Sequence, residues 1–400
     1  MEQRFKQADA LRGLAALTVM LCSIFLIFPV FFARTQGQSG FLLLNLLKHS
    51  PISLIWSAHS AVILFFVLSG FVLALPFTDR LGEQRYVPFL FKRICRIYIP
   101  YIAVVLLAMS ASMIIPRIDY APDMSVWFHS QWRIPVTMEA LFAHLLLIGQ
   151  FDTDAFQYTI WSLVHEMRIS IIFPFLMVIV MRLNWKFNLL LALFCSGLGH
   201  AGKYVLFHLY GNPTPPLSSF HATIHYIALF IIGALLAKHR TGLISFYQKL
   251  GRPVHVALLL AAVLLYTYDT WFLPSVGRLH MWIVNDWAIA AGSFLLLWWA
   301  IASKSSAQAG LVWRSLQGLG RISYSLYLVH PVLLLTMTRL LYGLLPLWLN
   351  VILGAAAALG VSVLLHRFVE LPAMQLGRQV ERQLNRRDYA RLTEPDIAGK

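Results

Sequence analysis

Residues 57–77, SAHSAVILFFVLSGFVLALPF, decide the fold class of this chain. The stretch holds one ionisable side chain, His59, and a helix of about 20 apolar residues is what crosses the hydrocarbon core of a bilayer. The sequence therefore predicts an all-α transmembrane bundle of about ten spans. The predicted spans are roughly 11–33, 57–77, 98–115, 168–182, 187–207, 219–237, 254–273, 283–302, 322–342 and 345–366.

The composition agrees with a lipid-facing surface. Of the 400 residues, 59% are hydrophobic and 12% are charged, whereas soluble domains carry about 25% charged residues. The fourth predicted span is short, so we expect it to begin near Trp161. A further apolar piece, 139–150, is too short to cross the bilayer and is interpreted as a buried or re-entrant segment. Three scattered cysteines indicate neither a disulfide framework nor a metal site.

The net charge of +15 is explained by topology. With the N-terminus placed in the cytoplasm, 24 of the 32 lysines and arginines fall on the cytoplasmic side and seven on the other, with Arg168 at a span boundary. This split follows the positive-inside rule, so the bundle is predicted to be N-in and C-in, in contact with the lipid bilayer and not with nucleic acid. Residues 1–370 form the predicted membrane domain and residues 371–400 a basic cytoplasmic tail that opens with a short amphipathic helix.

Polar side chains within the spans are costly in lipid and are therefore functional candidates. Arg12 and Ser23 are eleven residues apart, which places them on one helical face and about 16 Å apart along the axis. Arg93 and Arg96 share a helical face at the entrance to the third span and suit a phosphate-bearing ligand, although anionic lipid headgroups are an alternative. Ser69 begins a pair of small residues that lets a helix or a ligand come close.

The segment WSLVHEMRIS (161–170) is the most unusual, because His165, Glu166 and Arg168 open a span. Such a group suits proton transfer, and a structural ion-pair network is the alternative. Ser323, Tyr327 and His330 form a polar stripe on a later span, where hydrogen bonds between helices are the alternative.

A metal site is not predicted. His221 and His225 have the spacing of a two-histidine metal pair, but no adjacent acidic or cysteine partner completes a ligand set.

These segments, in this order, resemble the acyltransferase 3 family of membrane-bound O-acyltransferases. The matching pieces cover the chain from end to end, and the form WSLVHEMRIS is similar to the branch that modifies bacterial exopolysaccharides. The matching pieces are DALRGLAAL (9–17), FFVLSGFVL (65–73), KRICRIYIP (92–100), WSLVHEMRISIIFP (161–174), GRISYSLYLVHP (320–331) and RFVELP (367–372).

The resemblance implies an enzyme of the bacterial inner membrane that moves an acyl group, usually acetyl, from cytoplasmic acyl-coenzyme A to a hydroxyl of a glycan or its lipid-linked precursor. Acetyl-coenzyme A is the expected co-substrate, and no metal is expected. The residues assigned to the donor are Arg12, Arg93, Arg96, Ser69 and Tyr327. The candidate catalytic residues are Ser23, His59, His165, Glu166 and His330.

The chain departs from the family at one position. The family pattern is an arginine, ten residues and then a histidine regarded as catalytic, but here Ser23 follows Arg12 at that spacing. Another histidine could act as the base, Ser23 or Cys22 could accept the acyl group covalently, or the protein could be inactive. The rival functions are an impaired family member that serves as a binding or assembly partner in polysaccharide export, and a transporter of small molecules or lipids.

Overall fold

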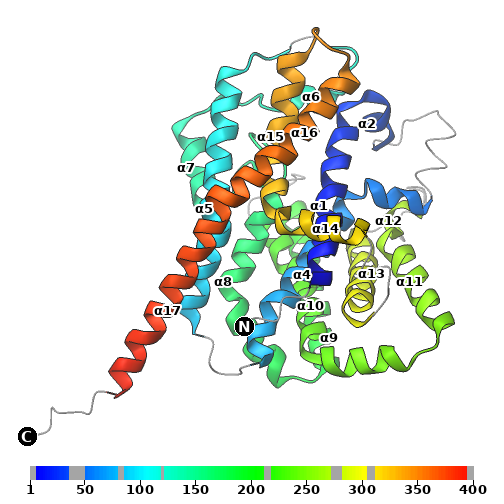
Figure 1. Cartoon of the computed structure of the whole chain (residues 1–400), viewed down its shortest axis with the longest axis vertical. Helices are drawn as coiled ribbons and strands as arrows, with labels where there is room; N and C mark the ends of the chain where they lie inside the picture. The colour runs from blue at the N-terminus through cyan, green and yellow to red at the C-terminus, as the bar shows by residue number, and fades with distance from the viewer. Residues whose placement is uncertain are drawn as a thin grey trace, which may run out of the picture.

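The computed structural model describes residues 6–35, 50–79, 85–118, 121–210, 218–271, 282–303 and 311–393. Within these ranges the chain forms helices and no strand, which confirms the predicted all-α bundle (Figure 1). The elements are α1 (Lys6–Ile27), α2 (Pro29–Thr35), η1 (Pro51–Ile55), α4 (Ala58–Asp79), α5 (Tyr86–Ile114), α6 (Val126–Ser130), α7 (Met138–Leu146), α8 (Ile160–Arg182), α9 (Trp185–Tyr210), α10 (Ser218–Lys249), α11 (Arg252–Tyr266), α12 (Tyr268–Trp271), α13 (Trp282–Ala302), α14 (Leu311–Arg321), α15 (Ser323–Leu341), α16 (Leu347–Leu365), η3 (His366–Glu370) and α17 (Leu371–Thr393).

Nine helical runs in the described ranges are long and apolar enough to cross a membrane, so the protein is a multi-pass membrane protein. They are α1, α4, α5, α8, α9, α10, α13, α15 and the run from α16 into α17. The predicted span 254–273 corresponds to α11, which has 15 residues, followed by the four residues of α12. Residues 272 and 273 lie outside the described part of the chain.

Two predicted spans differ from the observed helices. The span placed at 98–115 begins much earlier, at Tyr86, because Arg93 is buried inside the bundle and does not mark the helix end. The span placed at 11–33 is two helices, since Pro29 lacks the backbone N–H that would continue α1. The short apolar piece at 139–150 contains the nine-residue α7, whose first turn is capped by Thr137.

Helix α4 lies at the centre of the bundle and α9 lies at its edge. The membrane-crossing part of α4 is 72% buried, whereas that of α9 is 17% buried. Phe187, Leu190 and Phe194 on α9 are each more than half exposed. A row of exposed apolar side chains is the expected outer surface of a bundle whose solvent is lipid.

Glycines let α4 and α10 pack unusually close together. A Cβ on Gly70 would come within 2.2 Å of the carbonyl oxygen of Phe230, and a Cβ on Gly233 within 2.0 Å of that of Val67. Neither position has room for a side chain. Of the small pair at 69–70, Gly70 thus serves helix packing against α10, while Ser69 faces α8.

The helix expected at the start of the tail is long and packs against α5. A π-helical turn, η3, joins α16 to α17, so the chain runs helically across the boundary predicted at residue 370. Figure 1 shows α17 beside the first half of α5, where the Lys92 Nζ lies 3.1 Å from Glu381 Oε1. Residues 394–400 of the predicted tail lie outside the described residues.

Candidate active site

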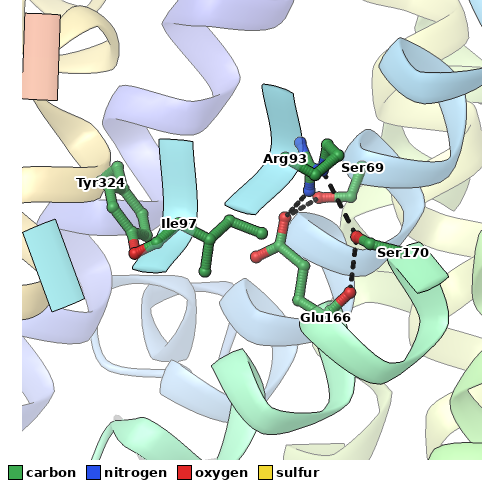
Figure 2. Close-up of polar contacts among 6 residues, drawn as sticks. All are labelled: Ser69, Arg93, Ile97, Glu166, Ser170 and Tyr324. Carbon is green, nitrogen blue, oxygen red and sulfur yellow. Dashed lines mark hydrogen bonds and ion pairs between the residues drawn. The ribbon is translucent and has the colours of Figure 1, made fainter. Parts of the chain in front are cut away.

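The best-defined polar contact in the bundle joins α5 to α8. Arg93 Nη2 donates to Glu166 Oε1 over 2.8 Å, and Ser69 Oγ from α4 donates to the same oxygen over 3.2 Å (Figure 2). Arg93 Nε reaches Ser170 Oγ over 3.4 Å. Three helices thus meet at one carboxylate, and the predicted residues Ser69, Arg93 and Glu166 are brought together.

Arg12 belongs to the same group of charges. The charges of Arg93, Arg96 and Glu166 all act on its guanidinium, together with that of Asp9. Its Nε is buried and has no hydrogen-bond partner within the described part of the chain. A buried N–H without an acceptor is costly, so this atom is suited to an acceptor that arrives with a ligand.

A narrow cavity of about 40 Å3, partly open to the outside, lies beside these groups. Its polar wall comes from α1, α4, α8 and α15. The polar residues that line it are Arg12, Ser69, Ser162, Glu166, Ser323, Tyr324 and Tyr327. Tyr327 Oη lies 2.7 Å from Ser162 Oγ and donates to the carbonyl of Thr159. Tyr324 Oη donates to the Ile97 carbonyl over 2.6 Å, and Figure 2 draws these two residues together with Arg93 and Glu166.

Ser23 and His330 form a second contact next to the cavity. Ser23 Oγ lies 3.2 Å from His330 Nε2. The ring centres of His330 and Tyr327 are 6.2 Å apart, so one aromatic side chain separates this pair from the cavity wall. The Tyr158 side chain also lies close enough to Ser23 to interact with it, and its ring is 6.4 Å from that of His330. Tyr158 precedes α8 and was not recognised in the sequence, because nothing local links it to α1.

His165 and Arg168 do not join Glu166. His165 Nδ1 lies 2.8 Å from Thr223 Oγ1 on α10, and Arg168 donates to the same oxygen over 3.0 Å. Consecutive helical residues point about 100° apart, so the three charges of the motif face two different neighbours. Glu166 and His165 thus face different neighbours, and of these two residues only Glu166 lines the cavity in the described part of the chain.

His59 also lies away from Ser23, in a separate cluster. Its Nε2 is 2.6 Å from Asp286 Oδ1, and His225 Nε2 is 3.0 Å from Asp286 Oδ2. His225 Nδ1 is 2.6 Å from Ser196 Oγ, which accepts from Trp287 Nε1. Both ring nitrogens of His225 thus have hydrogen-bond partners. The burial of His225 is explained without a metal ion shared with His221.

Sequence reasoning overlooked Asp286, although the signal was present. It is the only carboxylate in the predicted span 283–302, and an ionisable group within a span is a candidate by default. It is fully buried, like His225, whereas the His59 side chain is 36% exposed. The two partners come from α4 and α10, which no local pattern reveals.

The comparisons with known proteins give one match. No curated protein and no solved structure matches the chain. A family model described as an acyltransferase domain matches residues 5–367, a range that includes every polar group described above. The chain therefore belongs to the acyltransferase 3 family of membrane acyltransferases.

Proposed function

We propose that the protein transfers an acyl group, in the first instance acetyl, from acyl-coenzyme A to a hydroxyl of a cell-surface glycan or its lipid-linked precursor. Membership of an acyltransferase family supports the reaction type. Acyl-coenzyme A is proposed as the donor because Arg12, on the cavity wall, has a buried Nε without a hydrogen-bond partner among the described residues. Coenzyme A is polyanionic, and guanidinium groups match phosphate oxygens.

The positive charge at the cavity mouth favours such a donor. Arg12, Arg93 and Arg96 place three guanidinium groups against two carboxylates, those of Glu166 and Asp9. Arg93 is held by Glu166, so its charge is partly compensated. Arg12 would therefore be the principal phosphate contact, with Arg93 and Arg96 adding a favourable field. This group lies on the side of the bundle that the charge distribution predicts to be cytoplasmic, where acyl-coenzyme A is made.

The far end of the cavity suits the transfer step. Tyr327 and Ser162 end the polar wall there, and His330 lies just beyond with Ser23. A histidine near neutral pH is the usual base for removing a hydroxyl proton. His59 and His165 face other clusters, so His330 is the histidine that we propose for this role. A thin polar path between a cytoplasmic mouth and a site deep in the bundle fits a donor with a long, narrow arm.

We also propose a class of acceptor and a membrane location for the enzyme. The exopolysaccharide branch of the family is favoured by the form WSLVHEMRIS, and resemblance to that bacterial branch supports a location in a bacterial inner membrane. A glycan hydroxyl would approach from the end of the bundle that carries α6 and α7, because Tyr158 and the segment before α8 contact Ser23 and α15 from that end (Figure 1).

The donor assignment is tested by replacing Arg12. The Arg12→Met variant removes the guanidinium on the cavity wall whose buried Nε has no partner among the described residues, and we expect the dissociation constant of coenzyme A to rise about tenfold or more, since charge-assisted hydrogen bonds contribute about 1.5–3 kcal/mol. Binding is measured with radiolabelled coenzyme A on the purified protein in lipid nanodiscs. Acetyl transfer to surface polysaccharide is measured in inside-out vesicles.

Lys92→Met is the matched control. It removes a positive charge beside Arg93 on the same helix, but Lys92 faces Glu381 on α17 and not the cavity. Coenzyme A binding should be nearly unchanged. Equal losses in both variants would mean that only net charge matters, and unchanged binding in Arg12→Met would remove the donor site. Protein that binds coenzyme A and transfers nothing to any glycan would favour the impaired binding partner.

A further inference from the structure

We propose that Ser23 carries the acyl group as a covalent ester between donor and acceptor, with His330 as its base and Tyr158 as a hydrogen-bond donor to the reacting oxygen. The inference rests on the proposed acyltransferase function and adds a chemical step to it. It gives the three residues distinct catalytic roles and predicts two successive transfers instead of one direct attack by the acceptor.

The tautomer of His330 favours proton acceptance from Ser23. His330 Nδ1 lies 2.8 Å from the carbonyl oxygen of Leu326, one turn earlier in α15. A carbonyl oxygen can only accept, so Nδ1 carries the hydrogen and Nε2 has the free lone pair. Nε2 is the atom that lies 3.2 Å from Ser23 Oγ. This is the arrangement of a hydroxyl nucleophile and its general base.

Ser23 itself has a second acceptor within reach. Its Oγ lies 2.9 Å from the carbonyl oxygen of Val19, the usual position for a helical serine. The single hydroxyl hydrogen can therefore turn between that carbonyl and His330 Nε2. Rotation about the Cβ–Oγ bond moves the hydrogen and keeps the oxygen in place on the face of α1 that also carries Arg12.

Tyr158 completes the group from a third segment. Its ring centre lies 6.4 Å from that of His330, edge to face, and its hydroxyl lies close enough to Ser23 to interact with it. Burial raises the pKa of the Tyr158 hydroxyl, so it keeps its proton at neutral pH and can donate. A fixed donor beside the atom where charge develops stabilises a tetrahedral intermediate.

The two transfers balance as follows. Ser23 Oγ attacks the thioester carbon, its proton passes to His330 Nε2, the carbon–sulfur bond breaks, and coenzyme A leaves as a thiol after taking that proton. The acceptor hydroxyl then attacks the ester carbon and gives its proton to His330 Nε2. The bond from Oγ to the acyl carbon breaks, and Ser23 regains the proton. No oxidant, reductant or metal is needed.

The surroundings protect such an ester. Ser23 is 3% exposed and His330 is fully buried, so bulk water has no direct path to the acyl carbon. Eleven residues of α1 separate Ser23 from Arg12, about 16 Å of axial rise, which matches a donor whose phosphates and thioester lie at opposite ends of an extended arm. The thioester must pass beside Tyr327, the one ring between the cavity and His330.

The experiment is a chase with radiolabelled acetyl-coenzyme A and no glycan acceptor. The full-length protein in nanodiscs is quenched in acid and digested with trypsin, and the peptide 13–34 is sequenced by mass spectrometry. That peptide, GLAALTVMLCSIFLIFPVFFAR, has only Thr18, Cys22 and Ser23 as side chains that could hold an acyl group. We expect one label per chain on Ser23, resistant to neutral hydroxylamine, and released when glycan acceptor is added.

Three variants sharpen the result. Ser23→Ala should carry no label, and His330→Gln should slow labelling about 10^2–10^4-fold, the usual effect of losing a general base. In a Cys22→Ala background, Ser23→Cys should restore labelling as a hydroxylamine-sensitive thioester. Thr18→Val removes another buried hydroxyl of α1, one that contacts the Leu54 carbonyl and no histidine, and should label normally. Thermal unfolding of each variant shows whether it is folded.

The outcomes separate this step from the proposed function. Label on Cys22, or glycan transfer at the normal rate in Ser23→Ala, would overturn the covalent step while leaving the acyltransferase function in place. Wild-type protein that neither binds coenzyme A nor acetylates glycan would overturn the function and the step together. Label on Ser23 that adding the acceptor fails to release would reject Ser23 as an intermediate.

Discussion

The bundle contains two groups of paired charges that look alike in sequence and differ in their surroundings. Glu166, on the wall of a cavity and with its side chain 18% exposed, is paired with Arg93. Asp286 and His225 are both fully buried, and Asp286 is held from two sides by His225 and His59. Oε1 of Glu166 accepts from both Arg93 and Ser69, whereas Asp286 uses both of its oxygens, one for each histidine.

This difference separates binding from folding. Glu166 lines the cavity, so a ligand or water inside it can reach this carboxylate. Asp286 ends a closed chain in which Trp287 donates to Ser196, Ser196 to His225 and His225 to Asp286. A closed network of buried hydrogen bonds fixes how helices pack, and it offers nothing to a ligand. Substitutions at the two sites should therefore act on different observables.

The largest effect on stability is expected at Asp286. In Asp286→Asn the amide nitrogen would face an N–H of one histidine, donor against donor, in a dry interior. Losing one partner of a buried pair costs about 3–5 kcal/mol, and we expect unfolding in detergent to shift by that amount. Coenzyme A binding by the folded fraction should be unchanged. A variant as stable as the wild type would show that water already reaches this cluster.

The matched change at the cavity is Glu166→Gln. The retained Oε1 can still accept from Arg93 and Ser69, so stability should fall by about 1 kcal/mol, the difference between a charge-assisted and a neutral hydrogen bond. Removing the negative charge should tighten coenzyme A binding about fivefold, because a unit charge about 4 Å away in a water-like medium contributes about 1 kcal/mol. The gain should shrink as salt is added. Weaker binding would mean that Glu166 contacts the donor directly.

The smallest effect is expected at His59. The His59 side chain is 36% exposed, and Asp286 still has its contact with His225 when His59 is replaced. For His59→Gln we expect a loss of about 0.5–1.5 kcal/mol in the same detergent unfolding assay, the net contribution of one hydrogen bond. A loss as large as that of Asp286→Asn would place His59 among the residues that hold the bundle together. Loss of acetyl transfer without loss of stability would instead return it to the catalytic candidates.

Apolar length and charge asymmetry were enough to predict the fold class. They placed most spans correctly because each span obeys the same rule of about 20 apolar residues. They failed where a helix carries charge into the bundle, as at Arg93, since a hydropathy average cannot tell a buried arginine from a solvated one. They also missed that Pro29 ends α1 before the predicted span does.

The site was predictable only within single helices. The shared face of Arg12 and Ser23 follows from helical spacing, and so does the stripe from Ser323 to His330. Contacts between helices could not be derived, because the sequence gives no rotation of one helix about its axis relative to another. For that reason Glu166 was paired with its neighbour His165 instead of Arg93, and the contact of His330 with Ser23 came from the structure alone.

The close crossing of α4 and α10 has a consequence for both charged groups. Ser69 and His59 lie ten residues apart on α4, which is about 15 Å of axial rise. The same helix therefore supplies a residue of the cavity wall and, further along, a partner of Asp286. Gly70, next to Ser69 in the chain, packs directly against the backbone of α10. This contact leaves α4 no room to shift towards α10. Any tilt that widens the cavity must pivot at Gly70 and pull His59 relative to Asp286.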